Sequence, residues 1–409
     1  MQDTKLFETI LGLQAPWHIA RVELETATQR VDLWAEHDAT RWPCPECQQL
    51  LPCVDHAEER MWRHLDTCQF QTHLHARIPR VQCPTHGVKQ VRVPWAEPRA
   101  RFTQLMERLI IDVVQQCSTV IGACRILSIT WDEAWGVMER AVARGQARKV
   151  VRPMRYLGVD EKAFRKGQVY HTIVCDLERR TVEHVAEDRR ADSLAPFFAG
   201  LTPAQRDAID AVAMDMWDPY IKATREGLTD GAARVVFDRF HIMQEMNTAV
   251  DLVRKQEHRM LQRTAGDSVL TGSKYLWLYS RERLPKKHRQ RFKDLQALEL
   301  KVGRAWAIKE ALRTLWTYRR HSAATRFFQR WFHWARCSRL EPVRKSAATL
   351  KRHAEGILRY CQHPITNGAT EGINSKIMTI KRKACGFRNP RNFQTAIYFH
   401  CGGLDLYPR

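Results

Sequence analysis

The stretch RYLGVDEKAFRKGQVYHTIVCD, residues 155–176, determines the fold class that we expect for this chain. Its two apolar runs, 155–161 and 169–176, predict two strands, and residues 181–185 predict a third. Short turn-forming segments separate the three runs, as in a chain that folds back on itself. We therefore expect an antiparallel meander in which the first strand carries Asp160.

Two further apolar runs follow, and each ends in an aspartate. Residues 208–215 predict a fourth strand and residues 233–238 a fifth, with helical segments before and between them. Three antiparallel strands, a helix, a strand, a helix and a strand are the element order of an RNase H-like fold. Since the first and fourth strands of that fold are neighbours, we expect Asp160 and Asp215 to lie together.

Two carboxylates that share a site repel each other unless a cation lies between them, and oxygen ligands suit Mg²⁺. A third acid would complete such a site. Glu371 is the candidate, near the start of a predicted helix that Asn367 or Thr370 would cap. The alternative is that Glu371 only caps that helix. Four other acids compete, and we expect each to be a turn, cap or surface residue: Asp176, Asp210, Asp218 and Asp238.

Cysteines near the N-terminus form two short metal-binding patterns. Cys44 and Cys47 make one C-x-x-C pair, and Cys83 with His86 makes a C-x-x-H pair after a segment with partial strand alternation. Each pair can present two ligands to one tetrahedral Zn²⁺. The spacing predicts a zinc ribbon in which the metal is structural, because four side-chain ligands leave no open position. Ordinary buried cysteines are the alternative, and a second possible ligand set is Cys53, His56, His64 and Cys68.

A helix-turn-helix pattern follows the cysteine cluster. Residues from 102 onwards read as a helix, residues 120–127 as a second, and Trp131 begins a third that we expect to end near Ala143. Thr130 and Glu133 form a predicted capping box at its start. This arrangement is typical of DNA-binding domains, although a plain three-helix packing domain has the same pattern.

Composition points to a polyanionic partner. The chain has 409 residues, enough for two to four domains, and a formal net charge of +21. No apolar run reaches the roughly 18 residues of a membrane span, and the first residues do not read as an export signal, so we expect a cytoplasmic protein without a membrane partner. Twelve cysteines in a reducing compartment favour metal binding over disulfides.

Much of the positive charge lies between the fifth strand and Glu371. Residues 251–360 contain 27 Lys or Arg and 9 Asp or Glu, which predicts a long basic helical insertion that follows DNA phosphates. Its Leu312, Leu315, Trp316 and Tyr318 read as core residues. Outside the insertion, we expect Trp217 either to stack on an unpaired base or to pack. The residues expected to hold phosphates beside the catalytic acids are Lys376, Lys381, Arg382, Lys383 and Arg388.

Four separated motifs carry a family resemblance. They are residues 156–161 and 214–220 at the first two acids, 236–241 after the fifth strand, and 366–389 around Glu371. The chain resembles the ISL3 family of bacterial insertion-sequence transposases, which are of the DDE type, in these motifs. The resemblance extends to the two Cys/His pairs and the helix-turn-helix pattern that precede them. Cys385 stands where an aromatic residue is usual.

The resemblance implies Asp160, Asp215 and Glu371 as the catalytic metal-binding triad, with two Mg²⁺ or Mn²⁺ ions per active site. It implies double-stranded DNA as the partner, namely the inverted repeats of the element and the target, and a homodimer on DNA associated with the bacterial nucleoid. No small-molecule substrate is expected. The expected segments are a zinc-ribbon domain (1–98), a helix-turn-helix domain (99–152), an RNase H-like core (153–243), a basic helical insertion (244–362) and the last part of the core (363–409).

Three functions fit the sequence. The first is a transposase that cleaves DNA at the ends of its element and performs strand transfer. The second is a sequence-specific DNA-binding protein derived from a transposase and no longer used for catalysis. The third is a nuclease of the RNase H class that acts without strand transfer.

Overall fold

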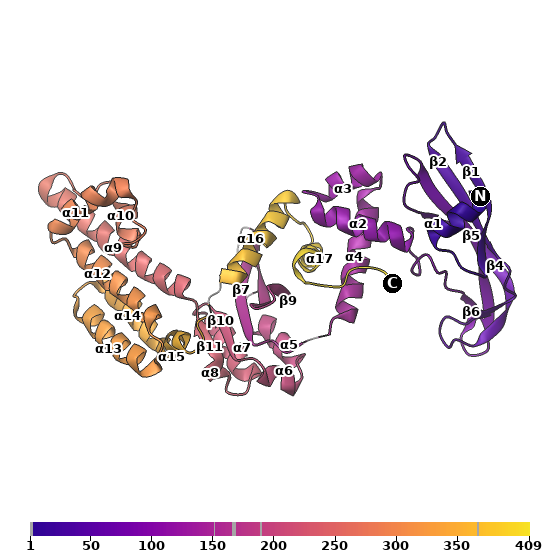
Figure 1. The fold of residues 1–409 in the computed structure, drawn as a ribbon. Helices are drawn as coiled ribbons and strands as arrows, with labels where there is room; N and C mark the ends of the chain where they lie inside the picture. Colours follow the sequence, from indigo (N-terminus) through magenta and orange to yellow (C-terminus); the bar gives the residue numbers. More distant parts are fainter. Residues whose placement is uncertain (1–2, 151, 166–168, 189, 366–367) are drawn as a thin grey trace. The chain divides into compact units, whose positions relative to one another are not determined.

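The computed structural model describes residues 3–150, 152–165, 169–188, 190–365 and 368–409 (Figure 1). The chain forms two compact units: Met1–Val150 together with Ile380–Arg409, and Val151–Thr379. Separate clusters of buried apolar residues form the cores of these units. Among the described residues, no helix combines the length and the apolar character that crossing a membrane requires.

The first unit begins with a six-stranded sheet in the order β1-β2-β5-β4-β3, with β6 paired to β5. Its core includes Trp17, Leu33, Trp62 and Leu74. Only the part around β5 was expected from the sequence, so the zinc-ribbon pattern lies within a larger sheet domain. The elements are α1 (Asp3–Leu11), β1 (Trp17–Glu25), β2 (Arg30–His37), β3 (Arg41–Pro43), β4 (Leu50–Arg63), β5 (Gln71–Cys83) and β6 (Gly87–Gln90).

The predicted helix-turn-helix follows as α2 (Gln104–Gln116), α3 (Val120–Leu127) and α4 (Trp131–Arg148). The predicted capping box is present, since the Thr130 side chain accepts from the backbone N–H of Glu133 and the Glu133 side chain accepts from that of Thr130. The last helix is longer than expected. Its extra turn carries Arg148, whose side chain donates to the backbone carbonyl of Tyr407 at 2.6 Å.

The C-terminal residues complete this helical core. Helix α17 (Pro390–Cys401) packs against α4, and Ala396, Phe399 and Leu406 are buried in the same cluster as residues of α2 and α4. The predicted segment 363–409 is therefore divided between the two units. Glu371 belongs to the second unit, whereas the apolar face of α17 groups with the helix-turn-helix.

The second unit contains a five-stranded sheet in the order β11-β10-β7-β8-β9. Strands β7, β8 and β9 form an antiparallel meander, and β10 runs parallel to both β7 and β11. The strands lie where the sequence predicted them. The elements are β7 (Tyr156–Arg165), β8 (Val169–Asp176), β9 (Thr181–Glu187), α5 (Ala191–Ala199), α6 (Pro203–Asp207), β10 (Ala211–Met214), α7 (Asp218–Gly227), α8 (Gly231–Arg234) and β11 (Val235–Phe237).

Helices fill the chain between β11 and residue 361. As predicted, Leu312 and Leu315 are buried in the core, and Trp316 and Tyr318 pack against it. Trp334, in contrast, is 45% exposed. The helices are α9 (Arg239–Ala265), α10 (Lys274–Leu278), η1 (Lys286–His288), α11 (Arg289–Ala297), α12 (Lys301–Arg313), η2 (Thr314–Thr317), α13 (His321–Cys337), α14 (Glu341–Arg352), α15 (Ala354–Leu358) and η3 (Arg359–Cys361).

Glu371 lies in the first turn of α16 (Gly368–Lys383). Thr370 was expected as a possible cap of this helix, which was wrong because Thr370 lies inside the first turn with its side chain buried. The other candidate cap, Asn367, lies outside the described residues.

Candidate active site and metal centre

Asp160 and Asp215 lie on neighbouring parallel strands. Strand β10 pairs with β7 so that Ala213 faces Gly158. Two residues further along both strands, the same register places Asp215 beside Asp160, with the strands about 4.8 Å apart. Facing residues of a parallel pair point to the same face of the sheet, so the structure brings these two predicted acids together.

The pKa of Asp215 reports on the acids around it. Burial is the largest cause of its rise to about 8, and the other causes are the negative charges of Asp160, Asp238, Glu161 and Glu371. A like charge disfavours ionisation only when it is close. All three predicted catalytic acids therefore share one neighbourhood.

Glu371 reaches this neighbourhood from α16 and, with Asp238, lines a cavity of about 870 Å³. Its wall also contains the acids Glu282 and Glu310, the aromatic residues Phe240 and Trp316, and four arginines, which are Arg239, Arg281, Arg283 and Arg313. A space of this size is in the range of small-ligand sites. Its wall combines carboxylates for a cation with guanidinium groups for phosphate.

Two residues with no role predicted from the sequence contact the aspartates. The Asn374 amide donates to Asp160 Oδ2, while the backbone N–H of Glu161 donates to Asp160 Oδ1 at 2.7 Å. His241 Nε2 lies 3.0 Å from Asp215 Oδ1. Both residues lie three positions from an acid in the sequence, Asn374 from Glu371 and His241 from Asp238, which on a helix places each pair on one face. That spacing was the available signal.

The donor set fits Mg²⁺ or Mn²⁺. Burial raises the pKa of Asp160, although the Glu161 N–H and the nearby Lys162 and His241 lower it. Carboxylates that repel one another in a partly buried site are stabilised by a divalent cation, which prefers oxygen ligands. Asp160, Asp215 and Glu371 are the residues that would hold such ions.

The predicted DNA-contacting residues are distributed over both units. Lys376 is exposed on α16, just over one turn after Glu371, and belongs to the second unit. Lys381, Arg382 and Lys383 form the last turn of α16 in the first unit, where exposed Arg388 also lies. Trp217 precedes α7 and is 38% exposed. Their roles stay predictions.

The competing acids separate into two groups. Asp176 is a turn residue, since it accepts from the backbone N–H groups of Glu178 and Arg179, and Asp210 forms a surface ion pair with Arg155. Asp218 is exposed in the first turn of α7. Asp238 differs from these three. It occupies the N-cap position of α9, which is one of the expected roles, but it is 3% exposed and its side chain makes no capping hydrogen bond.

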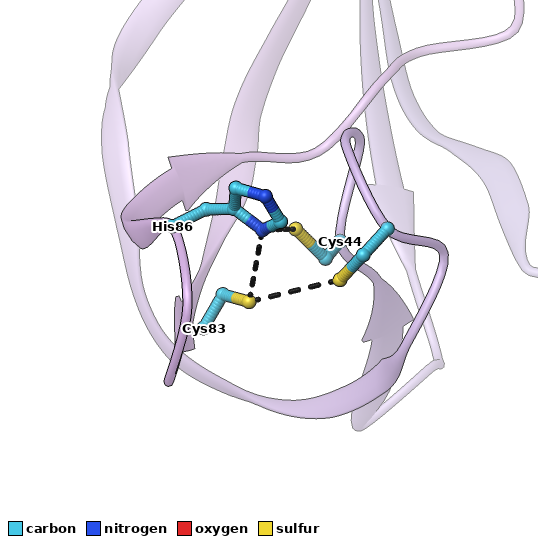
Figure 2. A group of neighbouring side chains, drawn as sticks. Cys44, Cys83 and His86 are labelled. Carbon is cyan, nitrogen blue, oxygen red and sulfur yellow. Dashed lines mark hydrogen bonds between the residues drawn. The ribbon is translucent and has the colours of Figure 1, made fainter.

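The predicted zinc ligands converge in the first unit (Figure 2). One ligand atom from each of Cys44, Cys47, Cys83 and His86 lies within 4.8 Å of the others. The Cys47 and Cys83 sulfurs are 3.7 Å apart, and His86 Nδ1 is 3.4 Å from the Cys83 sulfur. A tetrahedron with Zn–S bonds of about 2.3 Å has S···S edges of roughly 3.8 Å. The four side chains fit one structural Zn²⁺.

The second possible ligand set does not converge with these four residues. His64 is buried, with its Nδ1 2.8 Å from the Thr103 hydroxyl oxygen. His56 lies against His37, and the Cys53 thiol donates to the backbone carbonyl of Asp55. Cys68 is exposed. Within the described ranges, Cys44, Cys47, Cys83 and His86 are the one group of three or more potential ligands drawn together this closely.

Comparison with family models covers most of the chain. A model described as a transposase matches residues 157–397. A model for the zinc finger of transposases of IS204, IS1001, IS1096 and IS1165 matches residues 40–86. A model for the helix-turn-helix domain of transposase family ISL3 matches residues 91–142.

Two relatives match along nearly their whole length. The transposase for insertion sequence element IS1001 of Bordetella parapertussis is 27% identical over 398 residues, which cover 96% of this chain and 97% of the relative. The transposase for insertion sequence element IS1557 of Mycobacterium tuberculosis is 26% identical over 420 residues, covering 96% and 94%.

Proposed function

Since the chain belongs to the ISL3 family of insertion-sequence transposases, we propose that it binds the terminal inverted repeats of its own element and catalyses Mg²⁺-dependent DNA cleavage and strand transfer there. The observation that carries this proposal is the convergence of Asp160, Asp215 and Glu371. They come from β7, the residue after β10, and α16, which are far apart in the sequence, and the charges of Asp160 and Glu371 both raise the pKa of Asp215.

The proposed catalytic core is RNase H-like. Its support is the strand order β11-β10-β7-β8-β9 with one antiparallel meander and two parallel additions. Helices α9 to α15 would then form an insertion between β11 and the helix that carries Glu371. The excess of basic residues in this insertion supports a role in following the DNA backbone.

The proposed reaction has two steps at one site. In the first, water attacks the phosphorus at the element end and the bond to the 3′ oxygen breaks, which leaves a 3′-hydroxyl. In the second, that hydroxyl attacks a phosphodiester of the target and displaces its 3′ oxygen. When bound, a pair of divalent ions would activate the attacking oxygen and stabilise the leaving one.

The residues of this chain would contribute position and charge. Asp160, Asp215 and Glu371 would hold the ions. Asn374 would orient Asp160 through its amide, and the ring of His241 lies beside Asp215. The arginines of the cavity wall would hold phosphate oxygens, because a guanidinium group matches phosphate in a bidentate geometry.

Recognition of the element ends is assigned to the first unit. The zinc-bearing sheet domain and the helix-turn-helix would bind double-stranded DNA, with α4 as the helix that enters the major groove. Two copies would act together on two ends, and the basic residues from Lys376 to Arg388 would hold flanking phosphates. The site of action would be the nucleoid in the bacterial cytoplasm.

Substitution of the acids tests the proposal. Asp160→Asn, Asp215→Asn and Glu371→Gln should each bind DNA ends like the wild type but lose cleavage in Mg²⁺ or Mn²⁺ by at least about 10³-fold, since each removes charge stabilisation of the reacting phosphate. Cleavage of an end-labelled duplex and a gel-shift assay measure the two properties. Retained cleavage in any variant would remove that residue from the triad.

The same assays separate the other functions. A wild-type protein that binds ends but never cleaves them would be the DNA-binding derivative. A protein that cleaves but does not join a pre-cleaved 3′-hydroxyl end to target DNA would be a nuclease without strand transfer.

A further inference from the structure

We infer that Asp238 is a fourth carboxylate of the metal site, one that would bind a divalent cation together with Asp215 and Glu371. The inference rests on the proposed function, because it adds a ligand to the same site. The sequence alone leaves open whether Asp238 is a helix cap or a metal ligand.

The sheet register places Asp238 next to Asp215. Strand β11 pairs with β10 so that Phe237 faces Met214. The next residues are Asp238 and Asp215, and the backbone N–H of Asp238 donates to the carbonyl of Met214 at 3.0 Å. Asp160 lies on the other side of Asp215 by the register of β7. The three aspartates therefore form one row across three adjacent parallel strands.

The sequence shows the same row. Residues 156–160, 211–215 and 235–238 each place an apolar or small-residue run directly before an aspartate. Asp215 and Asp238 follow the carboxyl ends of β10 and β11, whereas Asp160 lies within β7 beside them. Ligands of open α/β sheets bind outside the carboxyl ends of the strands. If Asp238 were only a helix cap, there would be no reason for aspartates to stand at matching positions on the two neighbouring strands.

The buried carboxylate of Asp238 has one oxygen for which the described residues supply no hydrogen-bond partner. Asp238 is 3% exposed, and its Oδ2 is shielded from solvent and makes no hydrogen bond among the described residues. It stands at the N-cap of α9, but its side chain makes no capping hydrogen bond. Burying an unpaired charge is costly, so a bound cation would supply what is missing.

Other buried acids of the second unit are satisfied. Asp176 accepts hydrogen bonds from two backbone N–H groups and the side chain of Arg179. Glu257 accepts from the backbone N–H groups of Lys301 and Val302. The exception is Asp238, which faces the cavity that Glu371 also lines and acts by its charge on Asp215.

Direct metal binding tests the inference. The zinc-loaded full-length protein is titrated with Mn²⁺, and free Mn²⁺ is followed by its electron paramagnetic resonance signal. Asp238→Asn keeps the shape of the side chain and should weaken Mn²⁺ binding by at least about 10-fold. The control is Asp210→Asn, the same change at the other end of β10 on an ion-paired surface aspartate, and it should bind Mn²⁺ like the wild type.

The outcomes distinguish two failures. Wild-type Mn²⁺ affinity in Asp238→Asn, with weakened binding in Asp215→Asn and Glu371→Gln, would overturn this inference alone. Unchanged Mn²⁺ binding in Asp215→Asn and Glu371→Gln would instead overturn the proposed function.

A thiolate substitution separates a ligand from a structural role. Asp238→Cys should lose DNA cleavage in Mg²⁺ and recover part of it in Mn²⁺, because a transition-metal ion accepts a thiolate more readily than Mg²⁺ does. Equal loss in both metals would contradict a ligand role. This comparison also decides the matter if Asp238→Asn does not fold.

Discussion

Buried side chains determine the pH response of the first unit, and His64 is the clearest case. Burial, with a smaller contribution from Arg63, lowers the pKa of His64 to about 4, whereas an exposed histidine titrates near 6.5. The unfolded chain therefore binds a proton that the folded chain does not as the pH falls through this window. The contribution of His64 to the free energy of unfolding is fully present above about pH 6.5 and is lost progressively as the pH falls toward 4.

We predict that His64→Gln weakens this acid sensitivity. Between pH 7 and pH 5 the wild type should lose about 2 kcal/mol of stability through His64, which the variant should not lose. Thermal unfolding of both proteins with zinc bound gives the comparison. An equal fall of Tm in the two proteins would show that His64 does not titrate on unfolding. His73, whose pKa burial also lowers to about 4, remains in both proteins as a shared background.

The residue scale also shows what sequence reasoning could not reach. It found Asp160 and Asp215 because each ends or interrupts an apolar run that predicts a strand. It expected Asp238 to be a turn, cap or surface residue, and an aspartate before a helix is a preferred cap. The structure shows no capping bond there. The register of the sheet decides whether such a carboxylate lies beside an acid of the neighbouring strand or only caps its own helix. A single sequence does not reveal that register.

Among the elements, α4 allows a direct test of a predicted cap. Thr130→Ala removes the hydroxyl that accepts from the backbone N–H of Glu133, which should cost about 1 kcal/mol of stability in the first unit. Thr130→Ser keeps the hydroxyl and should remain close to the wild type. Denaturant unfolding of the three proteins measures the difference. Equal midpoints for Thr130→Ala and the wild type would mean that tertiary packing alone fixes the start of α4.

The two sheets differ in how well the sequence predicted them. Strands β10 and β11 are buried on both faces and read as continuous apolar runs. Strand β1 instead has a register shift between Ile19 and Arg21, which interrupts the alternation that reveals a half-buried strand. Strand β4 is largely exposed over its 14 residues and shows no regular alternation of buried and exposed positions. Its partners, rather than its own pattern, make it a strand.

For the whole molecule, the division into two units predicts two separate responses to metals. Cys44→Ser removes one ligand of the zinc site and should reduce zinc content below one ion per chain. The sheet has its own apolar core around Leu33 and Leu74. We therefore expect the two turns that carry the zinc ligands to become less ordered while the sheet stays folded. The second unit contains none of these ligands and should unfold as before.

Calorimetry with elemental analysis can check this. The unfolding transition whose temperature Mg²⁺ raises belongs to the second unit, and its temperature should be the same in Cys44→Ser and the wild type. The unfolding temperature of the first unit should be lower in Cys44→Ser. The matched control is Cys337→Ser, which changes an exposed cysteine of the second unit. Full zinc content in Cys44→Ser would contradict the ligand assignment.

The packing of α17 and the last residues against α2 and α4 has a consequence in time. Roughly 230 residues of the second unit are synthesised between the two parts of the first. At about 5–20 residues per second, the helix-turn-helix waits roughly 10–50 s on the ribosome before Ala396, Phe399 and Leu406 can fill its core. The core of the helix-turn-helix is thus completed last, after Asp160, Asp215 and Glu371 have been synthesised.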